Sequence, residues 1–177
     1  MKAFVCAAFL LLASGHAALA QDNKAPAAGK PVNVDIKNAQ GQSVGTAQLT
    51  SVPKGVKIVL DIKTFPPGEH SIHIHQVAKC EGPDFKSAGP HFDAKGMDHN
   101  DHTMHAGSPA GDIPNFSLIV AADGTAHTSV VAPNVTLGSD NHSVFSNGGT
   151  SIVIHAATAA SSSAPARIAC GVITKPE

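Results

Sequence analysis

Two histidines one residue apart are the feature of this chain with the most direct chemical meaning. His73 and His75 lie in an alternating polar and apolar run over residues 71–75. Residues i and i+2 of a β-strand point to the same face, so the two imidazoles would project side by side toward one metal ion. Imidazole binds copper, zinc, iron and nickel, and a site with several imidazoles favours Cu(II) on affinity. The alternative is a polar strand face on which both histidines meet solvent.

Further histidines and an aspartate follow this pair along the chain. Residues 76–115 are rich in Gly, Pro, Asp, His and Lys and show no strand pattern. A stretch of that length without secondary structure is uncommon inside a domain and is usually functional. The sequence therefore predicts a long loop that carries metal ligands. The candidates within it are His91, His99, His102, His105 and Asp112.

The elements that must position these side chains are short strands. Eight segments, most of them alternating, are separated by turn residues and show no helical period. Asp123 and Gly124, between two of the segments, form a strong hairpin-turn signal. This pattern predicts an all-β sandwich or barrel. The predicted strands are 32–36, 43–49, 56–62, 69–75, 116–120, 125–131, 151–155 and 168–173.

The first twenty residues have the three parts of a secretory signal peptide. Lys2 provides the positive start, residues 3–12 are apolar, and Ala18 to Ala20 match a small-x-small cleavage site. An exported chain without a membrane anchor is expected in the periplasm if its source is a Gram-negative bacterium. The predicted organisation is a signal peptide over 1–20, a flexible tail over 21–31 and one domain over 32–177.

Composition limits the possible partners and predicts a disulfide. Without Lys2, the chain has 11 basic and 13 acidic side chains, and no basic patch is available for nucleic acid. No other apolar run is long enough to cross a bilayer, so we expect no membrane anchor. The oligomeric state is left open. Cys80 and Cys170 remain after cleavage, and an even pair in an exported protein predicts a disulfide, two unpaired buried thiols being the alternative.

Four separated motifs follow one another along the chain. They are GEHSIHIH at 68–75, GPDFKSAGPHF at 82–92, AGDIPN at 110–115 and RIACGVI at 167–173. In this order they resemble the copper/zinc superoxide dismutase family of the bacterial exported type, and the resemblance covers about residues 32–174. It implies an all-β, eight-stranded Greek-key β-sandwich or barrel with a long metal-binding loop, closed by a disulfide between Cys80 and Cys170. It also implies a structural role for His70 near the copper site.

The resemblance also implies a reaction and a set of copper ligands. Copper would cycle between Cu(II) and Cu(I), oxidising one superoxide anion to oxygen and reducing a second to hydrogen peroxide, as antioxidant defence outside the cytoplasm. Zinc has no redox chemistry and could not replace it. His91 would bridge copper and zinc, release copper on reduction and then carry a proton to the peroxide. The implied copper ligands are His73, His75, His91 and His155.

Arg167 is the only arginine of the chain. A planar guanidinium offers paired hydrogen-bond donors to a small anion. The resemblance implies that Arg167 lies beside copper and binds superoxide. The alternative function is an exported copper-binding or buffering protein on the same fold, which Met97 and Met104 favour because thioethers bind Cu(I). Arg167 favours the enzyme, since a copper buffer has no need of an anion-binding arginine.

The resemblance is incomplete at the zinc site. The family uses the bridging histidine, two loop histidines and an aspartate; His99 and Asp112 match this set together with His91, but Pro109 stands where the third histidine is expected. A nearby histidine of the loop could replace it. The candidates for this replacement are His105 and His102.

A second departure affects the same site. Ala159 stands where the family has an aspartate that links the two metal sites through hydrogen bonds, and losing such a partner typically lowers metal affinity about 10–100-fold. Zinc binding is therefore left open at this stage. Ala159 lies in the run 156–166, which contains no charged side chain.

Overall fold

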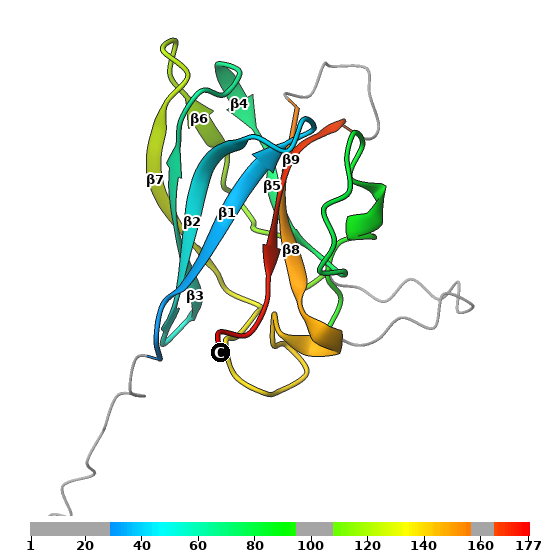
Figure 1. The fold of residues 1–177 in the computed structure, drawn as a ribbon. Coiled ribbons are helices and arrows are strands. Elements are labelled where there is room, and N and C mark those ends of the chain that lie inside the picture. The colour runs from blue at the N-terminus through cyan, green and yellow to red at the C-terminus, as the bar shows by residue number, and fades with distance from the viewer. Residues whose placement is uncertain (1–28, 95–107, 157–164) are drawn as a thin grey trace, which may run out of the picture.

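The computed structural model describes residues 29–94, 108–156 and 165–177 (Figure 1). Its regular structure is almost entirely β-strand, and none of its helices has the length and apolar character needed to span a membrane. Two short 3-10 turns, η1 (Lys86–Ala88) and η2 (Ser146–Gly148), complete the elements. The strands are β1 (Val32–Asn38), β2 (Ser43–Val52), β3 (Gly55–Ile62), β4 (Gly68–His70), β5 (Ile72–His75), β6 (Leu118–Val120), β7 (Ala126–Ala132), β8 (Thr150–His155) and β9 (Arg167–Ile173).

The strands form one large curled sheet and one small sheet. Seven strands are paired in the order β5-β8-β9-β1-β2-β3-β7, and β4 pairs with β6. All named strand pairs are antiparallel. Figure 1 shows β9, the last strand, lying between β1 and β8, so strands distant in sequence are neighbours. Such an arrangement is of the Greek-key kind. The predicted all-β sandwich or barrel is confirmed.

Alternation of apolar and polar residues explains which strand face points inward. In β1 the buried residues are Val32, Val34 and Ile36, and the residues between them are exposed. Burying one such side chain contributes about 1.5–3 kcal/mol to stability. Strand β8 differs, because all of its residues are buried. Its outer face is covered by a loop whose Phe85 and Ala88 pack against Val153 of β8.

One predicted strand is divided in two. The segment 69–75 breaks at Ser71, where the chain passes from the small sheet to the large one. His70 of β4 is paired with Leu118 of β6, whereas Ile72 of β5 is paired with Ile154 of β8. Alternation predicts an extended chain but does not encode which neighbour each half will pair with. The described residues therefore form nine strands where the sequence predicted eight.

Two loop segments are attached to the free edge of β5. Phe92 N–H donates to the Ile74 carbonyl (2.8 Å), and Ile74 N–H donates to the Gly111 carbonyl (2.9 Å). Gly111 N–H donates in turn to the Phe92 carbonyl (2.8 Å). A Cβ at Gly111 would lie 2.1 Å from the Ile74 carbonyl oxygen, so only glycine allows this approach. The result is that His91 lies opposite His75 in an isolated β-bridge.

The disulfide ties a second part of the same region to β9. Cys80 is bonded to Cys170, with 5.6 Å between their Cα atoms and a sequence separation of 90. This confirms the predicted pairing. The bond fixes the loop that carries Phe85 against the last strand, beside the strands that bear three of the candidate metal ligands.

Candidate metal centre

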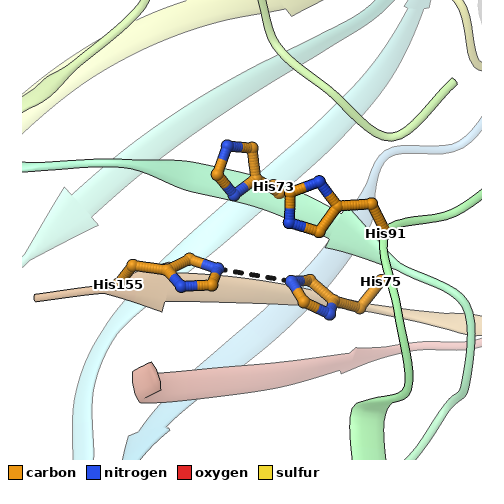
Figure 2. Close-up of side chains that lie close together, drawn as sticks. All are labelled: His73, His75, His91 and His155. Carbon is orange, nitrogen blue, oxygen red and sulfur yellow. Dashed lines mark hydrogen bonds between the residues drawn. The ribbon is translucent and has the colours of Figure 1, made fainter. Parts of the chain in front are cut away.

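Four histidines from three parts of the chain meet at one point (Figure 2). His73 and His75 come from β5, His155 ends β8, and His91 comes from the loop attached to the edge of β5. One ligand nitrogen from each ring lies within 4.8 Å of the others. The structure thus brings together the four residues that the resemblance assigned to copper.

Hydrogen bonds to the backbone orient two of these rings. His75 Nδ1 lies 2.9 Å from the Gly89 carbonyl, and His155 Nδ1 lies 3.2 Å from the Pro165 carbonyl. A carbonyl can only accept, so each Nδ1 carries the proton and each Nε2 keeps its lone pair. The two Nε2 atoms are 3.3 Å apart. Two lone pairs this close repel each other unless a cation lies between them.

His73 supplies an independent indication of a metal. Its Nδ1 is buried and has no hydrogen-bond partner within the described part of the chain. Buried polar atoms are almost always paired, and an exception calls for an explanation such as an ion. The convergent imidazole nitrogens therefore fit a copper ion, for which imidazole is a suitable ligand.

Burial keeps the clustered imidazoles neutral. It lowers the pKa of His73 to about 4, with further contributions from the nearby His91 and His155. It lowers the pKa of His75 to about 3 against the opposing effect of the Gly89 carbonyl, and it also lowers the pKa of His155. At neutral pH these three rings are in the uncharged form that binds metals.

The fourth ring, His91, is held by a carboxylate in place of a backbone carbonyl. Its Nδ1 lies 2.6 Å from Asp112 Oδ1, and about a third of each side chain is exposed. The ring also stacks on His73, with 4.2 Å between ring centroids. Since Nδ1 is engaged by the carboxylate, Nε2 is the nitrogen that His91 offers to the cluster.

Arg167 begins β9, directly opposite His155. Its guanidinium donates one hydrogen bond to the Phe85 carbonyl (2.9 Å), which belongs to the loop held by the disulfide. Its positive charge contributes to the lowered pKa values of His75 and His155, which places the charge near the cluster. The anchor on the Phe85 carbonyl was not anticipated, because nothing in the sequence marks a particular carbonyl as an acceptor.

His70 contacts the backbone of the histidine cluster but is not one of its four members. It is buried, and its Nδ1 lies 2.9 Å from the His155 carbonyl while its Nε2 lies 2.9 Å from the Pro66 carbonyl. This agrees with the structural role predicted for it. His127 and His142, which lie outside the four family motifs, are exposed.

The predicted zinc residues are only partly within the described chain. His91 and Asp112 are in contact, and Pro109 closes the turn before Asp112, whose N–H donates to the Pro109 carbonyl (3.1 Å). The remaining residues predicted for this site lie outside the described part of the chain. These are His99, His102, His105 and Ala159.

Comparisons with known proteins agree with this geometry. Residues 43–173 match the family described as copper/zinc superoxide dismutase (SODC). A Cu-Zn superoxide dismutase of Aquifex aeolicus, number 2, is 39% identical over 96% of each chain, and number 1 of the same organism is 40% identical over 80% of this chain and 86% of its own. A crystal structure of a SOD-like protein from Bacillus subtilis aligns with a TM-score of 0.67 and 30% identity, covering 82% of this chain and 99% of the other.

Proposed function

The chain belongs to the copper/zinc superoxide dismutase family, and we propose that its four clustered histidines bind the copper at which it dismutates superoxide. The family and its named relatives make the protein an oxidoreductase with superoxide as substrate. The observation that supports the ligand assignment best is the unpaired, buried Nδ1 of His73 at the point where the other three rings converge. The proposed ligands are His73, His75, His91 and His155.

Bound copper would supply the one-electron chemistry of the reaction, by which two superoxide anions and two protons become oxygen and hydrogen peroxide. The protein supplies rigid ligands and an anion site. His75 and His155 keep their Nε2 atoms turned inward because their Nδ1 atoms donate to carbonyls. Arg167 donates one hydrogen bond to the Phe85 carbonyl. Because a guanidinium has five N–H donors, the others remain to bind superoxide.

We assign the proton step to His91. The rings of His75 and His155 are buried, whereas about a third of the His91 side chain is exposed and lies within reach of water. In this assignment His91 Nε2 takes up a proton and delivers it to the reduced oxygen species. Asp112 holds the Nδ1 atom of the same ring meanwhile.

The place of action is proposed from the N-terminal sequence. Residues 1–20 have the form of a signal peptide, so the mature protein would begin near Gln21 and act in the periplasm or outside the cell. The Cys80–Cys170 disulfide supports export, since disulfides persist in oxidising compartments. The proposed organisation keeps residues 21–31 as a tail and residues 32–177 as the domain.

The test is a copper titration of the protein that begins at Gln21. We expect one copper per chain, a Cu(II) electron paramagnetic resonance (EPR) spectrum with nitrogen ligands, and rapid turnover of superoxide. Copper binding without turnover in any metal state would favour the alternative, an exported copper-binding protein. Failure to bind one copper with nitrogen ligands would overturn the ligand assignment.

A further inference from the structure

We infer that Asp112 positions the copper ligand His91 through a direct hydrogen bond, and that this positioning does not require zinc. The inference rests on the proposed copper site and deepens it. It begins from a conflict between two observations on the same residue. The resemblance makes Asp112 a zinc ligand, yet in the structure its carboxylate is in contact with the ring that it would share zinc with.

The distance between the two groups is that of a hydrogen bond. His91 Nδ1 and Asp112 Oδ1 are 2.6 Å apart, which is short even for a charge-assisted bond. Two ligands of one tetrahedral zinc, each about 2.0–2.2 Å from the metal, lie roughly 3.3 Å from each other. In the structure the pair is therefore arranged as an N–H donor and a carboxylate acceptor.

Backbone hydrogen bonds hold Asp112 beside His91 in the structure. Gly111 is hydrogen-bonded between Ile74 of β5 and Phe92, and no Cβ could be accommodated there. The next residue, Asp112, is fixed further by the turn closed on the Pro109 carbonyl. Pro109 has no side chain that can bind a metal, and here its carbonyl serves the turn.

The Asp112 carboxylate accepts a hydrogen bond from Nδ1 of His91, as backbone carbonyls accept one from Nδ1 of His75 and of His155. It fixes the proton on Nδ1, leaves the Nε2 lone pair for copper and sets the orientation of the ring. All three of these rings are then held by acceptors within the protein. Removing such a partner typically lowers metal affinity or activity about 10–100-fold.

The experiment compares copper-loaded, chelator-treated protein of the wild type, Asp112→Ala, Asp112→Asn and a control, Asp123→Asn. Asp123 is an exposed turn carboxylate, and asparagine suits the same turn. We expect wild-type protein with less than a tenth of an equivalent of zinc to turn over at a rate that added zinc leaves unchanged. Asp112→Ala should bind copper about 10–100-fold more weakly and with an altered EPR spectrum.

The Asp112→Asn variant keeps the shape of the side chain and one acceptor oxygen, so it should fold even if Asp112→Ala does not. We expect it to be intermediate in affinity and in EPR spectrum, with the control indistinguishable from wild type. If the wild-type protein loaded with copper alone does not turn over superoxide, and one equivalent of zinc restores turnover, the inference is overturned and the proposed function is left intact. An unchanged copper affinity and spectrum in both Asp112 variants would overturn it as well. Absence of turnover in every metal state would instead count against the proposed function.

Discussion

The two sides of the His91 ring are built in different ways. On its proposed copper side stand three histidines from β5 and β8, which are neighbours in one antiparallel ladder. On its other side stands a single carboxylate, Asp112, brought in by a loop and partly exposed. The sheet therefore specifies the proposed copper ligands, whereas the Nδ1 side of His91 depends on a loop whose residues can change without altering the fold.

Pro109 illustrates this difference. A proline in the middle of a sheet would remove a ladder hydrogen bond and disturb the ligands next to it. In the loop it takes the place of an expected histidine and still supplies a carbonyl to the turn before Asp112. The loop side of His91 can therefore lack an expected histidine while the sheet side keeps all three of its histidines.

The largest effect is expected from removing a ligand on the sheet. His155→Ala should lower copper affinity by well over 100-fold, beyond the 10–100-fold loss typical of a supporting residue, and turnover should disappear with the metal. Titration with a competing chelator measures the affinity. His127→Ala, an exposed histidine on β7, is the matched control and should behave as wild type. A loss of threefold or less in His155→Ala would contradict the distinction between the two sides.

The next effect concerns Arg167, which lies on the sheet side opposite His155. Arg167→Lys keeps the charge but loses the planar fork, both for the anion and for the Phe85 carbonyl. A hydrogen bond to a charged group is worth about 1.5–3 kcal/mol, so turnover should fall roughly 10–100-fold. Copper affinity should stay unchanged, since Arg167 is not a ligand. Pulse radiolysis on fully copper-loaded protein measures the rate, and a wild-type rate would remove Arg167 from the substrate site.

A third prediction uses the lowered pKa values of the sheet histidines. The pKa is about 4 for His73 and about 3 for His75 in the native protein, against about 6.5 in an unfolded chain. Between these values the unfolded chain binds more protons, so the free energy of unfolding of the metal-free protein falls as the pH falls from about 6.5 to 4. Urea denaturation at pH 7 and pH 5 checks this.

The direction in which the urea midpoint of unfolding moves between pH 7 and pH 5 tests this prediction. Midpoints should be lower at pH 5, and bound copper should leave this difference in place, because the metal keeps the native rings unprotonated while the unfolded chain still takes up protons. His127→Ala should show the wild-type slope, since that side chain is exposed. A midpoint that rises on acidification would contradict the assignment of neutral, buried imidazoles.

The smallest effect is expected in the dependence of the rate on salt. Residues 156–166 carry no charge, whereas charged loops steer anions and make association rates fall with ionic strength. We expect the rate to change by about twofold or less between roughly 10 and 150 mM salt. A steep fall would show that charges elsewhere guide superoxide to the copper side.

Features carried by residue type and spacing were predictable from the sequence. The strands, the Cys80–Cys170 bond and the ligand pair on β5 all follow from alternation, cysteine count or i, i+2 geometry. Features that depend on which backbone carbonyl comes close were not. The Phe85 carbonyl on Arg167 and the break at Ser71 arise from pairing between distant segments, which local pattern does not encode.

The loop attached to β5 has a consequence for the protein in a crowded solution. Strand β5 is an edge of the large sheet, and such an edge is normally a template on which another molecule can add a strand. Here both backbone groups of Ile74 are occupied by Phe92 and Gly111. The same loop that presents His91 therefore closes this edge, so mutations that detach it should promote aggregation as well as inactivation.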